Sequence, residues 1–113
     1  YIGDGIYELV IRTAVVGQGN RQTNALHKKT STYVKASAQA AMMEAILEDL
    51  TEEELAVYKR GRNAKTVSMA KHATMHDYRH ATGFEALMGY LYLKEDYSRI
   101  VELVRKGIPE ENL

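Results

Sequence analysis

The chain of 113 residues contains no cysteine and only one proline, Pro109. Without cysteine it can form neither a disulfide framework nor a thiolate metal site, which is the usage expected of a cytoplasmic protein. The apolar runs are too short to span a membrane, and no basic segment followed by an apolar one resembles a signal peptide. These absences favour a protein with no membrane segment.

Regular alternation of β-branched residues is also scarce, whereas Ala, Leu, Met, Glu and Lys are plentiful. This composition favours an all-α fold. Hydrophobic residues make up 45% of the chain, enough for a core, and no repeat or interior linker divides it. We therefore expect one domain over residues 1–113. Because Tyr1 already stands inside a helical pattern, we expect the natural protein to begin further upstream.

Apolar spacing and capping residues predict about six helices. Thr51 and Glu54 are spaced as a capping box, Asp96 is a suitable N-cap, and Gly107 is a suitable helix end. Residues 63–76 are expected to be irregular. The predicted helices are approximately 3–16, 24–29, 32–49, 52–62, 77–94 and 97–106.

The net charge is zero, but the charges are unevenly distributed. Residues 59–80 carry six basic side chains and one acidic side chain, whereas both flanking segments are acidic on balance. A basic block in a neutral protein is a candidate contact for a polyanion. From charge alone, a solvated loop explains the block equally well.

Two carboxylates stand in apolar helical surroundings. Asp4 lies beside the apolar stripe of the first predicted helix, and Glu85 lies in the middle of an apolar one. An inward-facing acid is costly unless it is paired or bound to a metal. If these helices pack together, a hard cation such as Mg²⁺ would relieve the repulsion between the two acids. The pattern alone favours a plainer alternative, in which Asp4 starts a helix and Glu85 pairs with Arg79 or Arg12.

Four segments, taken in order, resemble one known family. Tyr1–Glu8 (YIGDGIYE) is similar to the second half of the ribonuclease III signature, and residues 84–93 (FEALMGYLYL) to that family's other metal-binding helix. Residues 24–29 (NALHKK) and 59–65 (KRGRNAK) are similar to Mini-ribonuclease III in particular. That branch has the catalytic domain and lacks the separate domain that binds double-stranded RNA.

The resemblance implies an all-helical ribonuclease III catalytic domain that acts as a homodimer, with the signature helix at the two-fold interface. One RNA duplex would cross both active sites, and the products would carry 5′-phosphate and 3′-hydroxyl ends. The implied substrate is the paired ends of precursor 23S ribosomal RNA, and a large-subunit ribosomal protein is a further candidate partner. Asp4 and Glu85 match the family's acidic residues, which implies that they are the catalytic ligands of Mg²⁺, with Mn²⁺ able to substitute.

The sequence departs from the larger ribonuclease III enzymes at two places. Thr82 stands where those enzymes have an aspartate, three positions before Glu85. Their glutamates just upstream of the Gly-Asp pair correspond to positions before Tyr1. The number of metal ions in each site therefore stays open.

Basic residues around the resemblance segments are expected to contact RNA phosphates, because double-stranded RNA is recognised mostly through its shape and backbone. Asn63 lies among them. The four histidines show neither triad nor zinc spacing, and they are expected to lie in loops or near RNA. The predicted RNA-binding residues are Lys28, Lys29, Lys59, Arg60, Arg62, Asn63 and Lys65, and the histidines are His27, His72, His76 and His80.

Two other functions remain open at this point. Thr82 keeps open a protein of the ribonuclease III fold that binds structured RNA with weak or no cleavage. A helical scaffold without any RNA role is the other alternative. Cleavage of a duplex that is lost in Asp4→Asn while binding survives would separate the enzyme from both.

Overall fold

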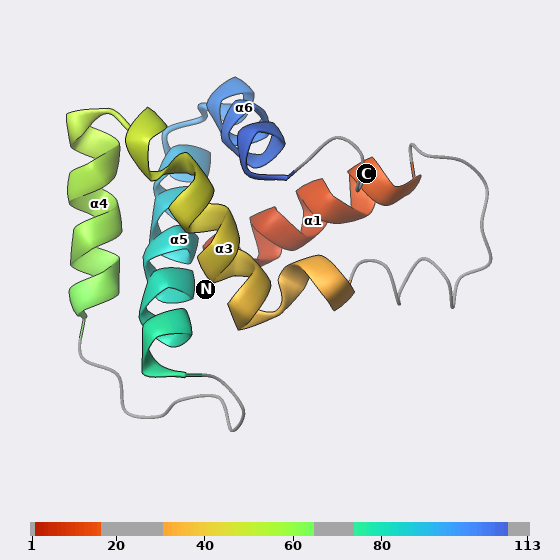
Figure 1. Cartoon of the computed structure of the whole chain (residues 1–113). Coiled ribbons are helices and arrows are strands. Elements are labelled where there is room, and N and C mark those ends of the chain that lie inside the picture. The colour runs from red at the N-terminus through yellow and green to blue at the C-terminus, as the bar shows by residue number, and fades with distance from the viewer. Residues whose placement is uncertain (1, 17–30, 65–73, 109–113) are drawn as a thin grey trace.

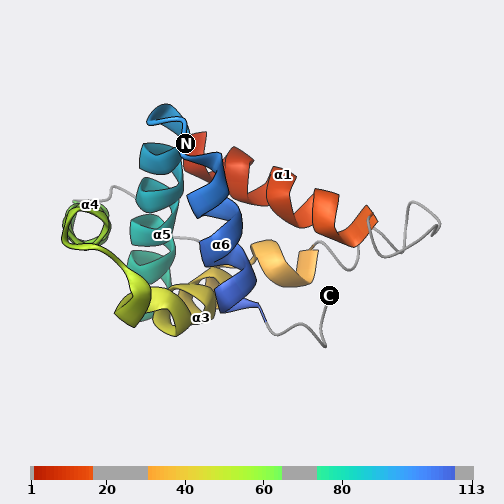
Figure 2. The same cartoon turned by 90° about the horizontal axis from the view of Figure 1, so that it is seen from above.

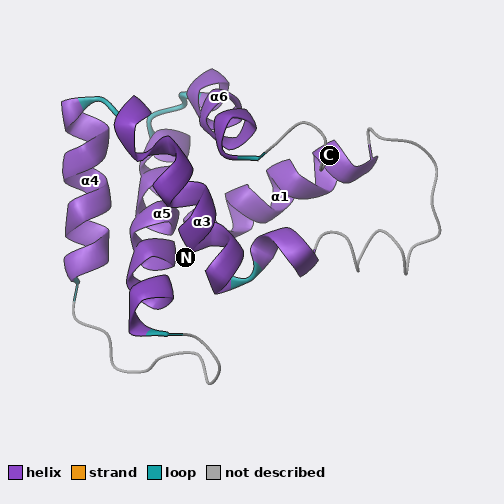
Figure 3. Cartoon of the chain, in the orientation of Figure 1, coloured by secondary structure: helices purple, strands orange, loops and turns teal. Residues whose placement is uncertain are grey.

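The computed structural model describes residues 2–16, 31–64 and 74–108, and these residues are helical without any strand (Figure 3). This confirms the all-α prediction. The predicted helix at 24–29 lies outside the described residues, as do Lys28, Lys29 and Lys65. The elements are α1 (Ile2–Val16), α3 (Ala36–Ile46), the short 3-10 helix η1 (Leu47–Asp49), α4 (Glu52–Asn63), α5 (Met75–Leu93) and α6 (Tyr97–Gly107).

Helix α5 forms the centre of the fold. It contacts α1, α3, α4 and α6, and in Figures 1 and 2 α4 and α1 lie on opposite sides of it. Its buried residues include Phe84, Leu87, Met88 and Leu91, which form the core together with apolar side chains of α1, α3 and α6. The Phe84 ring meets the buried ring of Tyr7 edge to face, with 4.9 Å between centroids. None of the described helices is long and apolar enough to cross a membrane.

Side-chain hydrogen bonds cap the starts of α4, α5 and α6. The Thr51 hydroxyl accepts a hydrogen bond from the backbone N–H of Glu54, and the Glu54 carboxylate accepts one from the N–H of Thr51. The Asp96 carboxylate caps α6 by accepting from the N–H of Arg99. Helix α5 begins at Met75, two residues earlier than predicted, because Thr74 caps it through the N–H of Asp77.

The prediction of one continuous helix over 32–49 was wrong. Residues 31–34 are helical, but Lys35 is extended, with φ −66° and ψ 151°, and α3 starts afresh at Ala36. The break leaves carbonyls without helical partners, and side chains satisfy two of them. The Tyr7 hydroxyl donates to the carbonyl of Tyr33, and the Gln39 amide donates to that of Val34. Beyond Ile46 the chain tightens into η1.

Candidate metal and RNA-binding site

The start of α1 packs directly against the main chain of α5. A Cβ atom placed on Gly3 would lie 1.8 Å from the carbonyl oxygen of Glu85 and 2.8 Å from the backbone nitrogen of Gly89. Only glycine allows the two backbones to approach this closely. The contact places Asp4, the next residue, beside the turn of α5 that carries Glu85.

The two acids differ in exposure and influence each other. Asp4 is exposed and Glu85 is half-buried. Burial raises the pKa of the Glu85 carboxyl, and the negative charge of Asp4 raises it further. Each effect disfavours the ionised form of Glu85. The structure therefore brings together the two acids that the sequence singled out, and they repel each other.

No basic side chain of the described residues forms an ion pair with Glu85. Arg12, one alternative partner considered from the sequence, forms its ion pair with Glu8, one helical turn away. Arg79, the other alternative partner, is exposed and forms no ion pair within 2–16, 31–64 and 74–108. Within the described residues, this half-buried carboxylate beside a second carboxylate therefore has no cationic side chain that pairs with it.

The donor set fits a hard divalent cation. Carboxylate oxygens are preferred ligands of Mg²⁺, which commonly uses one or two protein carboxylates and retains several waters. Because Asp4 is exposed, its side of the pair is open to water and to a phosphate group. The Thr82 hydroxyl, on the preceding turn of α5, donates to the carbonyl of Tyr78 at 2.8 Å. Thr82 therefore supplies no third carboxylate to this site.

The raised pKa of Glu85 leads to a prediction about stability. A carboxyl with a raised pKa in the folded state destabilises the fold once the pH exceeds its unfolded-state pKa. We expect Glu85→Gln, which resembles the protonated form, to raise the Tm of the metal-free protein by a few degrees at about pH 7. The gain should vanish below the usual pKa of glutamate, where the carboxyl is protonated in both states.

Thermal unfolding in a chelator, at neutral and at acidic pH, measures this effect. Glu8→Gln is the matched control, because it removes a carboxylate of α1 that already has a cationic partner. An unchanged or lower Tm for Glu85→Gln at neutral pH would contradict the account of an uncompensated carboxylate.

The second half of α4, which carries basic side chains, packs against the part of α5 that contains Glu85. Gly61 packs on α5, where an added Cβ would lie 2.6 Å from Cβ of Ala86 and 3.1 Å from Cα of Gly83. Residues on either side of Gly61 therefore lie beside the turn of α5 that contains Glu85. The predicted RNA-binding residues among them are Lys59, Arg60, Arg62 and Asn63.

These side chains differ in how firmly they are held. Lys59, Arg60 and Asn63 are exposed, and none of the basic residues of α4 forms an ion pair in the part of the chain that the structure describes. The Arg62 guanidinium lies over the Tyr58 ring, 5.5 Å from its centroid, and its Nε donates to the Asn63 amide oxygen at 3.2 Å. Exposed basic side chains without acidic partners among the described residues are suited to contact a phosphate backbone.

Comparison with known proteins identifies the family. Residues 1–96 match the ribonuclease III domain. A Mini-ribonuclease 3 of Enterococcus faecalis is 52% identical over 99% of this chain and 89% of its own length. The chain belongs to the Mini-ribonuclease 3 family. A Mini-ribonuclease 3 of Clostridium tetani is 49% identical over 93% of this chain and 70% of its own length.

A solved structure agrees with this assignment. A crystal structure of a protein from Fusobacterium nucleatum superposes with a TM-score of 0.80 and 32% identity, over 90% of this chain and 81% of that one. The fold is therefore that of the ribonuclease III domain, as the sequence predicted. As a Mini-ribonuclease 3 family member, the protein is an endoribonuclease of the ribonuclease III type.

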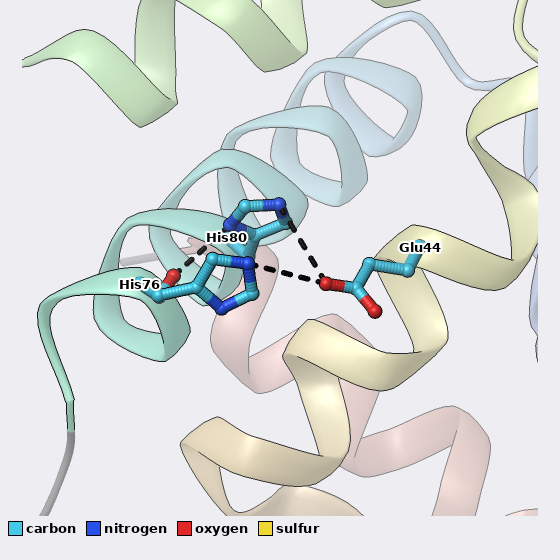
Figure 4. Close-up of side chains that lie close together, drawn as sticks. All are labelled: Glu44, His76 and His80. Atoms are coloured by element: carbon cyan, nitrogen blue, oxygen red, sulfur yellow. Dashed lines mark hydrogen bonds and ion pairs between the residues drawn. The ribbon is translucent and has the colours of Figure 1, made fainter.

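Sequence reasoning missed one cluster of side chains. His76 and His80 of α5 lie close to Glu44 of α3 (Figure 4). The histidines show no zinc spacing in the sequence and were expected in loops or near RNA, but His76 and His80 lie one turn apart on α5. Glu44 comes from a separate helix, and only the packing of α3 on α5 brings it there. His27 and His72 lie outside the described residues.

Proposed function

We propose that this Mini-ribonuclease 3 family member cleaves double-stranded RNA with Mg²⁺ held by Asp4 and Glu85, and that it matures the paired ends of precursor 23S ribosomal RNA. The observation that carries the proposal is the half-buried Glu85 carboxylate beside Asp4, with no cationic side chain among the described residues to pair with it. The family relationship supports the class of reaction. The residues 1–113 serve in this proposal as one catalytic domain of a cytoplasmic enzyme.

The chain's contribution to the reaction is mainly positioning. When bound, Mg²⁺ or Mn²⁺ supplies a Lewis acid for the phosphoryl group and lowers the pKa of a coordinated water. Glu85 is held in place by the core residues around it on α5, and the close Gly3 contact sets Asp4 against it. Exposed Asp4 faces the solvent from which the phosphodiester arrives. Hydrolysis would leave 5′-phosphate and 3′-hydroxyl ends.

Basic side chains would hold the RNA. Lys59, Arg60 and Arg62, with Asn63, would contact phosphate and sugar groups, which gives affinity without reading the base sequence. Lys28, Lys29 and Lys65 are proposed for the same role, although they lie outside the described residues. A large-subunit ribosomal protein is a candidate for presenting the ribosomal RNA.

A homodimer would align two such sites on one duplex. Ile2 and Leu9 of α1 are exposed apolar side chains, with Leu9 61% exposed. Burial of this face against a second copy in a two-fold dimer would remove the apolar side chains from water.

Incubation with defined RNAs tests the proposal. A long perfect duplex should be cut in Mg²⁺ and left intact in chelator, whereas a single strand of the same sequence should resist cleavage. A precursor 23S duplex should give ends at the mature termini, which primer extension and 3′-end mapping measure. Binding without cleavage of any duplex, over a range of Mg²⁺ and Mn²⁺, would contradict the enzymatic proposal. Cleavage away from the mature termini would contradict the ribosomal substrate alone.

Removing basic residues from α4 should weaken RNA binding in a salt-dependent way. The double variant Lys59→Ala with Arg60→Ala is expected to lower the slope of log affinity against log salt by roughly one unit for each phosphate that the protein no longer neutralises. Titrations of duplex RNA at several salt concentrations measure the slope. Arg105→Ala removes an exposed basic residue of α6 and is the matched control. Equal slopes in all three proteins would show that α4 does not bind the RNA backbone.

A further inference from the structure

A second cluster of side chains of the kinds that bind metals is formed by Glu44 of α3 with His76 and His80 of α5 (Figure 4). Each residue of an α-helix turns by about 100°, so His76 and His80 point roughly 180° and 140° away from Glu85 around the helix axis. One ligand atom each from Glu44, His76 and His80 lies within 4.8 Å of the others. The cluster joins α3 to the first turns of α5 and is separate from the Asp4–Glu85 pair.

The hydrogen bonds around the two rings direct one nitrogen of each toward Glu44. His80 Nδ1 lies 3.0 Å from the carbonyl oxygen of His76, and only a protonated nitrogen can donate to a carbonyl. In the neutral ring, Nε2 of His80 therefore carries the lone pair, and it lies 4.0 Å from Oε1 of Glu44. This arrangement, in which an outer partner fixes the tautomer, is typical of metal-binding histidines.

His76 is arranged in the same way. Its Nδ1 lies 3.4 Å from Oδ1 of Asp77, and its Nε2 lies 3.2 Å from the same Glu44 oxygen. Two imidazole nitrogens thus converge on one carboxylate oxygen. In a tetrahedral zinc site with bonds of about 2.0–2.1 Å, neighbouring ligand atoms are roughly 3.3 Å apart. The observed separations of 3.2 Å and 4.0 Å approach that spacing. The two rings are stacked with 4.1 Å between their centroids, so the side chains must rotate for both Nε2 lone pairs to meet at one ion.

We propose that Glu44, His76 and His80 form a site for a transition-metal cation of the Zn²⁺ class, with water as the fourth ligand. Imidazole ligands favour Zn²⁺ and similar ions, whereas sites made only of oxygen suit Mg²⁺. Glu44 and His76 are exposed, so an ion can enter from solvent, and His80 is held more firmly, with its ring against that of Tyr58. The bound ion links α3 to α5 and leaves the Mg²⁺ ligands unoccupied.

Calorimetric titration of the tag-free protein with Zn²⁺, in excess Mg²⁺, tests this site. The expected result is one Zn²⁺ per chain. Glu44→Gln and His80→Gln should each weaken binding by about 100-fold or more, because losing an outer partner alone typically costs 10–100-fold. Asp77→Asn, which alters only the outer partner of His76, should weaken binding by about tenfold.

Two controls separate this site from others. Glu52→Gln removes an exposed carboxylate from α4, outside the cluster, and should bind Zn²⁺ as the unaltered protein does. Asp4→Asn should also retain Zn²⁺ binding, so failure of the Mg²⁺ proposal would leave this result unchanged. Zn²⁺ should raise the Tm of the unaltered protein but not that of Glu44→Gln.

Two outcomes would overturn the proposal. Absence of Zn²⁺ uptake by the unaltered protein would show that His76 and Glu44 form only an ion pair. Equal uptake by the unaltered protein, Glu44→Gln and His80→Gln would show that the ion binds elsewhere. Circular dichroism of each variant confirms that a loss of binding does not reflect unfolding.

Discussion

Asp4→Asn is expected to reduce the rate of duplex RNA cleavage by about 10³-fold or more, while RNA binding persists. An asparagine side chain is nearly the same size but lacks the charge that would hold the cation beside Glu85. Metal-ion stabilisation of the transition state contributes several kcal/mol, and about 4 kcal/mol corresponds to a factor of roughly 10³. Single-turnover cleavage at saturating enzyme measures the chemical step, and a gel-shift titration in Ca²⁺ measures binding.

Glu8→Gln is the matched control for this experiment. Glu8 lies four residues after Asp4 on α1 and forms an ion pair with Arg12, so the structure gives it a cationic partner of its own. Its removal should change the cleavage rate little. An equal loss of cleavage in both variants would assign the effect to the overall charge of α1. Full activity of Asp4→Asn would remove Asp4 from the site.

Gly3→Ala should damage both stability and cleavage. The added Cβ would overlap the backbone carbonyl of Glu85, and neither helix backbone can move aside as a flexible side chain would. Overpacking of this kind costs about 1–3 kcal/mol and occasionally more. A shift of α1 would also move Asp4 relative to Glu85, so the cleavage rate should fall further than the loss of folded protein explains.

Gly5→Ala supplies the comparison from the same helix. Apart from the adjoining backbone of α1, no atom of the described residues lies within 4 Å of a Cβ added at Gly5, so within the chain the change in helix propensity is the main effect there. Glycine inside a helix is less stable than alanine by about 0.5–1 kcal/mol, so Gly5→Ala should raise the Tm. Thermal unfolding and cleavage assays on both variants measure the difference. Equal Tm values would contradict the close packing of α1 on α5.

Local signals in the sequence predicted much of the fold. The capping box at Thr51 and the cap at Asp96 depend on residues near one another in the chain, and the structure confirms both. The break at Lys35 was missed, because the bonds that support it come partly from Tyr7, which is distant in sequence. A continuous helix was the reasonable inference from residues 32–49 alone.

Glu54 shows how one residue can have a second role that its local pattern does not reveal. Its capping role with Thr51 was predicted, but its carboxylate also accepts hydrogen bonds from the guanidinium of Arg99 on α6. The hydrogen bonds from Arg99 are the main cause that lowers the pKa of this buried carboxyl. Contacts between separate helices depend on how the helices pack, which periodicity does not specify.

For the candidate sites, too, the sequence indicated single residues but not the contacts between helices. The unusual positions of Asp4 and Glu85 could be recognised in the sequence, but the Gly3 contact that brings them together depends on how α1 packs on α5. The cluster of His76 and His80 with Glu44 was not predicted, because Glu44 comes to the two histidines only through the packing of α3 on α5. Sequence patterns indicate which residues stand out, and tertiary packing decides which of them meet.

A crystal structure of the protein soaked in Mn²⁺ would test the central claim most directly, because the ion's anomalous signal locates it. The account predicts a peak between the carboxylates of Asp4 and Glu85, and no such peak in crystals of Asp4→Asn. A peak elsewhere with none between these two carboxylates, or one that persists there in Asp4→Asn, would contradict the proposed metal centre.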